Sequence, residues 1–183
     1  MRYIQGLAVD GVVLRTPSEG DAAAMAALMR RVYDETEFLN RTAAEFAVTD
    51  EEEAAFLARI ERSPRECMIG AWLDGCLVGN VNVGMVGDCA RLRHRAALGI
   101  AVVQKAWGRG VGSRLMEAAI QTAASAGYRQ IELETAADNV RALRLYERFG
   151  FAACGCWPEA LRRADGSYVD EVMMVRRLTG EIR

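Results

Sequence analysis

Residues 100–120 read IAVVQKAWGRGVGSRLMEAAI, an apolar strand that leads into three alternating glycines and then into an amphipathic helix. Glycine adopts left-handed backbone conformations readily and has no Cβ to obstruct a ligand. The first amides of a helix have no partners within it and lie at the positive end of its dipole, so they attract phosphate groups. Glycines also occur in turns that are only tight, but the flanking strand and helix favour a site for a phosphorylated cofactor.

Apolar periodicity and turn residues around this stretch predict one mixed α/β domain over residues 1–183. The apolar run Leu98–Val103 is typical of a central strand that is buried on both faces. Capping and hairpin signals mark Thr49 with Glu52, Asp74-Gly75 and Asp165-Gly166. We expect strands at 7–15, 67–73, 76–83, 91–103, 131–135, 151–157 and 168–177, and helices from Asp21 to about Tyr33, from Thr49 to before Pro64, from the glycines to Gly127, and from Asn139 to Phe149.

Composition excludes several classes of protein. The net charge is −2, whereas nucleic-acid binders normally carry a basic excess. No stretch reaches the roughly 20 apolar residues of a membrane span. With five cysteines, no pair of CxxC motifs and one histidine, we expect no metal site. The first residues lack the apolar region of a signal peptide, so we expect a cytoplasmic protein.

A dinucleotide-binding fold is the first alternative for the glycine turn. That fold uses G-x-G-x-x-G and an acidic residue about 20 positions later. Glu132 does lie 20 residues after Gly112, but the spacing here is G-x-G-x-G and too little chain follows for a second βαβ half. A P-loop is excluded because no Gly-Lys-Ser/Thr follows the turn.

A second motif separates these alternatives. Residues 139–151 carry the pattern N-x-x-A-x-x-x-Y-x-x-x-G-F, and the first stretch carries V-x-x-x-x-W-x-x-G-x-G from Val102 to Gly112. In this order and spacing, the two motifs resemble those of the GNAT superfamily of N-acetyltransferases, although Trp107 stands where that family usually has Arg or Gln. The resemblance implies a mixed, mainly antiparallel central sheet flanked by helices, with the glycine turn between strand 4 and helix 3. Residues 162–174 look like the subset that acts on amino acids, protein N-termini or small amines.

The resemblance also implies how acetyl-CoA binds as a co-substrate. Its pantetheine arm would pair with the strand at Ile100, Ala101 and Val102, and would lie near Asn139. Its pyrophosphate would contact the turn residues Gly108, Arg109, Gly110, Val111, Gly112 and Ser113.

Two residues are candidates for catalysis by the same resemblance. Tyr146 would lie near the sulfur and protonate the departing thiolate, because a phenol can act as a general acid. It lies seven residues, or about 10 Å, from Asn139 on one helix face. Its helical spacing with Leu143 and Phe149 would serve packing equally well. Glu134 is the candidate general base, although a glutamate at a strand end is often only solvated.

Other polar residues receive weaker interpretations. His94, between two arginines, is expected on the surface. Glu35, Glu37 and Phe38 would wall the acceptor pocket by resemblance, although the end of a charged helix explains the glutamates as well.

Three functions remain open. The favoured one is transfer of the acetyl group of acetyl-CoA to a primary amine through a tetrahedral intermediate, the acceptor being a small molecule or peptide: an amino acid, small amine, protein N-terminus or lysine. The others are a non-catalytic acyl-CoA-binding sensor of the same fold and a dinucleotide-binding enzyme. We expect no nucleic-acid or membrane partner, and a homodimer is left open.

Overall fold

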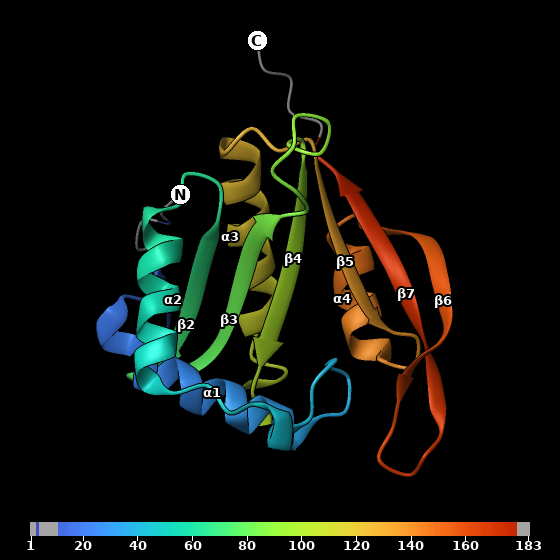
Figure 1. Cartoon of the computed structure of the whole chain (residues 1–183), viewed down its shortest axis with the longest axis horizontal. Coiled ribbons are helices and arrows are strands. Elements are labelled where there is room, and N and C mark those ends of the chain that lie inside the picture. The colour runs from blue at the N-terminus through green and yellow to red at the C-terminus, as the bar shows by residue number, and fades with distance from the viewer. Residues whose placement is uncertain (1–2, 4–10, 179–183) are drawn as a thin grey trace.

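A mixed sheet of seven strands forms the centre of the computed structural model, which describes residue 3 and residues 11–178 (Figure 1). The strand order is β1-β2-β3-β4-β5-β7-β6, and all neighbours are antiparallel except β4 and β5. This sheet confirms the predicted fold class. Its strands are β1 Val12–Arg15, β2 Cys67–Leu73, β3 Cys76–Met85, β4 Arg95–Val102, β5 Gln130–Ala136, β6 Ala152–Arg162 and β7 Tyr168–Arg177.

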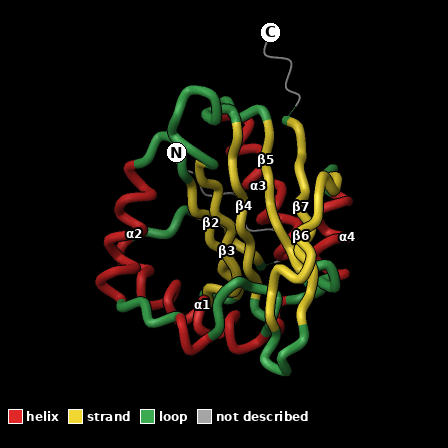
Figure 2. The backbone as a smooth tube through the Cα atoms, turned by 45° about the vertical axis from the view of Figure 1, so that its right-hand side comes forward, coloured by secondary structure: helices red, strands yellow, loops and turns green. Residues whose placement is uncertain are grey.

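Helices cover both faces of this sheet (Figures 1 and 2). One face carries α1 (Ala22–Glu35) and α2 (Asp50–Arg62), and the other carries α3 (Val111–Ser125) and α4 (Val140–Arg148). The predicted capping box starts α2, where the Glu52 amide donates to Thr49 Oγ1 at 3.2 Å and the Thr49 amide donates to Glu52 Oε2 at 2.9 Å. Short 3-10 turns lie at Glu19–Asp21, Ala43–Glu45 and Gln104–Ala106.

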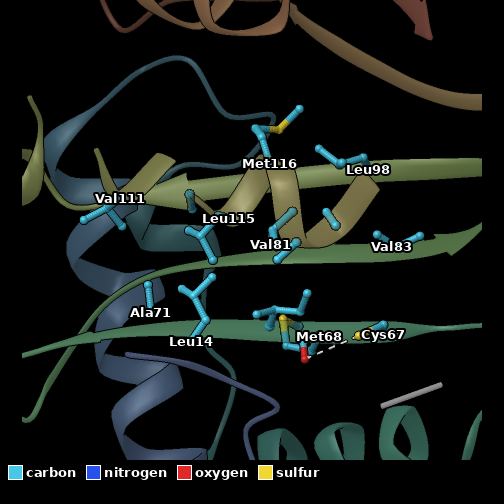
Figure 3. Close-up of a cluster of buried hydrophobic side chains, with 14 of the residues drawn as sticks. Leu14, Cys67, Met68, Ala71, Val81, Val83, Leu98, Val111, Leu115 and Met116 are labelled. Atoms are coloured by element: carbon cyan, nitrogen blue, oxygen red, sulfur yellow. Dashed lines mark hydrogen bonds between the residues drawn. The ribbon is translucent and has the colours of Figure 1, made fainter. Parts of the chain in front are cut away.

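Packing between α3 and the sheet fixes the position of the glycine turn (Figure 3). Leu115 and Met116 of α3 are fully buried, as are Val81 and Val83 of β3. Burying a side chain of this size contributes about 1.5–3 kcal/mol. Because this packing holds α3 on β2–β4, the first turn of α3 is held at the carboxyl end of β4.

The two parallel strands are joined over a short length only. Their ladder pairs Arg95 with Gln130, Ala96 with Ile131, and Ala97 with Glu132. Arg95 donates two hydrogen bonds to the carboxylate of Glu132, one of them at 2.6 Å, and so pins this joined end. Beyond it the strands diverge (Figure 1). We call this divergence, between residues 98–102 of β4 and 133–136 of β5, the seam.

Several predicted boundaries differ from those observed. β4 begins at Arg95 rather than residue 91, because residues 90–94 form turns. It is not buried on both faces, since Ala97 and Gly99 are exposed on one face while Ala96 and Leu98 are buried on the other. β6 extends to Arg162, because its pairing with β7 resumes at Leu161 after an irregularity. Residues 7–10 of the first predicted strand lie outside the described residues.

Candidate functional site

The glycine turn has the backbone conformation that its sequence predicts. Gly108 and Gly110 have φ angles of +74° and +76°, in the left-handed region, and a Cβ added at either would meet no heavy atom within 4 Å. These positions therefore need glycine for their backbone conformation, and the space above them is open. Gly112 differs, because an added Cβ would lie 3.4 Å from Leu145 of α4. That distance is an ordinary van der Waals contact, so α4 packs against the start of α3 without requiring glycine at this position.

The helix that follows offers donors to an anion. The Arg114 amide donates to the Gly110 carbonyl at 3.1 Å, so the amides of residues 111–113 precede this bond and have no acceptor within α3. Arg109 is exposed in the same turn. This end of α3 can therefore bind a phosphate group through backbone donors and the helix dipole.

Trp107, the residue that departs from the family motif, joins three elements at this site. Its Nε1 donates to the Val102 carbonyl at the end of β4, at 2.7 Å. The guanidinium of Arg141, from α4, lies 3.5 Å from the centre of the Trp107 ring. Arg148, about two turns further along α4, donates to Ser113 Oγ. Sequence reasoning missed both arginines, although their spacing of seven residues places them on one helical stripe.

The three strand residues that were predicted to bind the cofactor lie along the seam. Ile100, Ala101 and Val102 pair with β3 on one side, opposite Val81, Asn80 and Gly79. Their other side faces away from β3, where the ladder with β5 has ended. An extended ligand can therefore add to β4 as a further strand at this point.

Tyr146 lies on α4 and is only 7% exposed. Its ring packs against Phe151, with 6.0 Å between the ring centres. Burial raises the pKa of its phenol to about 12. Within residues 11–178 its hydroxyl has no hydrogen-bond partner. The phenol therefore stays protonated at neutral pH, with its proton available to a ligand.

Asn139 has a structural role that the sequence motif did not reveal. It caps α4, where its Oδ1 accepts a hydrogen bond from the Ala142 amide at 3.3 Å. The cap fixes the start of the helix that carries Tyr146. Loss of such a cap costs about 1 kcal/mol, so a substitution here would also act through stability.

Glu134 is exposed on β5, just past the last residue pair of the ladder. It lies near Glu171 of β7, whose pKa is raised first by burial and then by repulsion from Glu134. No hydrogen bond or ion pair joins Glu134 to Tyr146 in the described chain. Glu132, the acidic residue that a dinucleotide-binding fold would use, accepts a hydrogen bond from Arg95, and this bond lowers the pKa of Glu132.

The three residues that were expected to wall the acceptor pocket make other contacts. Glu35 ends α1 and accepts a hydrogen bond from the Gln104 amide at 2.5 Å. Glu37 pairs with Arg163 at 3.3 Å, and the same guanidinium lies 5.5 Å from the ring centre of Phe38. Arg163 also bonds Asp138, at 2.7 Å. Glu35 thus fits the end of a charged helix, whereas Glu37 lies beyond α1, and neither glutamate nor Phe38 lines the cavity described next.

A cavity lies on the face of the sheet that α1 and α2 cover, between these helices and β2–β4. Its volume is about 390 Å³. It reaches the seam at Gly99, Ile100 and Ala101. Its other walls are Met25, Met29, Tyr33, Leu39, Arg41, Phe46, Val48, Glu52, Glu53, Phe56, Met68, Asn80 and Asn82.

Two further findings concern the described residues as a whole. No helix among them has the length and apolar character needed to cross a membrane. Within residues 11–178, no three His, Cys, Asp or Glu side chains are grouped so as to hold a metal ion. His94 is exposed, as predicted.

Comparison with known proteins is consistent across sequence and structure. A sequence profile described as "Acetyltransferase (GNAT) family" matches residues 28–151. The L-amino acid N-acetyltransferase AaaT of Escherichia coli (strain K12) is 32% identical over 119 residues, which cover 64% of this chain and 72% of that protein. A GNAT-family acetyltransferase from Streptococcus pneumoniae superposes with a TM-score of 0.87 at 29% identity, covering 91% of this chain and 99% of that one. An acetyltransferase from Salmonella typhimurium, solved with acetyl-CoA, has the same fold, with a TM-score of 0.82, 18% identity and coverage of 94% and 97%.

Proposed function

Because this chain belongs to the acetyltransferase (GNAT) family, we propose that it transfers the acetyl group of acetyl-CoA to a primary amine. The observation that carries this proposal is the seam. The β4 edge that it leaves unpaired leads along the chain into the glycine turn. A free strand edge beside an anion-binding helix end suits a ligand with an extended amide arm and a pyrophosphate. The dinucleotide alternative lacks support, since Glu132 is engaged by Arg95.

Acetyl-CoA would bind along this line of donors. The amides of residues 111–113, the open space over Gly108 and Gly110, and the side chain of Arg109 would receive the pyrophosphate. The free edge at Ile100–Val102 would pair with the pantetheine arm and orient the thioester. Asn139 would lie near that arm as well as capping α4.

Transfer then requires a proton at the sulfur. The amine attacks the thioester carbonyl, a tetrahedral species forms, and the departing thiolate takes a proton from the Tyr146 hydroxyl. A phenol whose pKa is about 12 can donate only to a strong base. The mechanism therefore requires that the bound sulfur be shielded from water, because desolvation raises the pKa of a thiol as it raises that of the Tyr146 phenol.

Glu134 would remove the proton from the attacking amine. We expect Glu134→Gln to lower kcat/KM by roughly 10²-fold at neutral pH, the range of a general base. The loss should shrink as pH rises, because the acceptor then arrives as the free amine. Initial rates of CoA release across pH measure this, with exposed Glu117 of α3 changed to Gln as the control. A loss that is equal at all pH values would contradict the role of a base.

Arg141 would supply the cationic contact that Trp107 cannot. We expect Arg141→Ala to raise the Kd of CoA about fivefold, as for an exposed ion contact, and the difference to fade with added salt. Calorimetric titration with CoA checks this, with exposed Arg62 of α2 changed to Ala as the control. An unchanged Kd at low salt would leave Arg141 as packing for Trp107 alone.

The transferase itself is tested by CoA release from acetyl-CoA with a panel of amines. The relative from Escherichia coli is named for L-amino acids, so amino acids head this panel, followed by small amines and a peptide N-terminus. Release that depends on one amine class supports the proposal. Tight binding of acetyl-CoA without release for any amine would indicate the sensor instead.

A further inference from the structure

Glu53 is a buried acid on the inner side of α2. It is 7% exposed and shares that side of the helix with buried Leu57 and Ile60. Its carboxylate has no hydrogen bond or ion pair to any described residue. Burying a carboxylate without a partner is unfavourable, and here burial raises the pKa of Glu53. A residue kept in such a position suggests a ligand that supplies the missing partner.

Asn80 also lines this cavity, and its unpaired side-chain oxygen is covered by neighbouring atoms. It is 8% exposed on β3, opposite Ala101 of β4, and its Oδ1 is buried without a hydrogen bond. Its Nδ2 contacts Met68 Sδ at 3.3 Å. The Glu53 carboxylate is thus the buried charged group that lines the cavity, and the complementary ligand group is a donor with a positive charge.

The remaining walls define the rest of the ligand. They are mainly apolar and include the thioether and aromatic side chains of Met25, Met29, Tyr33, Phe46, Phe56 and Met68, with Arg41, Glu52 and Asn82 as the polar members. A volume of about 390 Å³ lies at the lower end of the range for small-molecule sites. The cavity also reaches Gly99–Ala101, where the seam would hold the thioester.

From these observations we propose that the cavity is the acceptor site, in which the Glu53 carboxylate accepts hydrogen bonds from the ammonium group of a small primary amine with an apolar body. The bound ammonium gives up one proton, to Glu134 in the function proposed above, before its nitrogen attacks the thioester. The inference rests on the proposed transferase function and narrows its acceptor. An ammonium group offers three donors and no acceptor, which matches the two unpaired oxygens of the Glu53 carboxylate. The thioethers and rings would cover the carbon skeleton.

Binding of 2-phenylethylamine in the presence of CoA tests this directly by calorimetry. We expect Glu53→Gln to weaken that binding roughly tenfold or more, as for a buried charge that loses its partner, and to leave the Kd of CoA unchanged. The neutral analogue 2-phenylethanol should bind the parent weakly and be indifferent to the substitution. Glu51, exposed in the same first turn of α2, provides the matched control Glu51→Gln.

Thermal stability separates this role from a structural one. Glu53→Gln removes an unpartnered buried carboxylate, so it should raise Tm at pH 8. The rise is measured relative to the Glu51→Gln protein, because both changes remove one acid from the same helix end. A residue that only supports the fold would give a lower Tm.

The parent protein gives a second readout that needs no substitution. Because the pKa of Glu53 is raised, its carboxylate takes up a proton at a higher pH than an ordinary glutamate, and amine binding should weaken as pH falls through that value. The other titratable and charged groups lining the cavity are Tyr33 of α1, Arg41 and Glu52, while β2, β3 and β4 contribute neutral groups. This pH step should be absent from Glu53→Gln.

Unchanged amine binding in Glu53→Gln, or a lowered Tm, would overturn the proposal, as would a pH step that persists in that variant. If amines still trigger CoA release while Glu53→Gln binds 2-phenylethylamine normally, only the acceptor site is wrong. If no amine triggers release, the transferase proposal itself fails.

Discussion

Tyr146→Phe should lower kcat by roughly 10²-fold or more, the contribution of a general acid, while acetyl-CoA binds with nearly the same Kd. The substitution keeps the ring against Phe151 and removes a hydroxyl that has no hydrogen bond within residues 11–178. Little packing is lost, so Tm should hardly change. Because burial raises the pKa of the phenol to about 12, the parent enzyme should show no loss of rate from Tyr146 ionisation below pH 10.

Tyr128→Phe is the matched control for this experiment. Tyr128 is also buried, but its hydroxyl donates to the Arg65 carbonyl at 2.8 Å. The same chemical change there should cost about 1 kcal/mol of stability and leave kcat unaltered. Single-turnover rates are compared with kcat, so that the two variants are tested under conditions in which chemistry limits kcat. An unchanged kcat for Tyr146→Phe under that condition would assign the proton to water and leave Tyr146 to the core.

Gly110→Val should raise the Kd of acetyl-CoA at least tenfold, or about 1.4 kcal/mol. The φ of +76° at Gly110 is unfavourable for a β-branched residue, so the turn would shift away from its present path. The valine side chain would also occupy the open space above the turn. Calorimetric titration with acetyl-CoA measures the effect, and circular dichroism establishes that the variant is folded.

Gly127 offers a control at the opposite end of the same helix. Its φ is +81°, and an added Cβ would again meet nothing within 4 Å. Gly127→Val should therefore introduce comparable backbone strain, about 1–2 kcal/mol, without affecting acetyl-CoA. A folded Gly110→Val protein that binds acetyl-CoA as well as the parent would place the site elsewhere.

Features that depend on neighbouring residues were predicted from the sequence with good accuracy. The capping box needs only Thr49 and Glu52, and the hairpin at Asp74-Gly75 needs only the two turn residues and their flanks. The glycine turn is similar, because the left-handed conformations at Gly108 and Gly110 are local properties. The family motifs then supplied the sheet type.

Features that depend on distant parts of the chain were missed or wrong. The apolar run Leu98–Val103 predicted burial on both faces, but Gly99 lies on the face where a cavity separates β4 from α1 and α2, and no local pattern gives that gap. The contact of Arg141 with Trp107 joins α4 to the turn before α3 and was equally hidden. For Glu53 a signal existed, since an acid interrupts the apolar side of α2.

The seam also affects how the protein opens. Within the sheet, three residue pairs and the Arg95–Glu132 ion pair join one unit, β1–β4, to the other unit, β5, β7 and β6. Because one hydrophobic core runs across both units, we expect local opening at this short ladder, at a lower free energy than global unfolding, and not independent unfolding of either unit. A ligand that bridges the seam must be released before either unit opens beside it, so binding couples their opening free energies. The bound co-substrate would thereby raise the free energy of opening on both sides of the seam. It would protect from hydrogen exchange backbone amides that it does not contact.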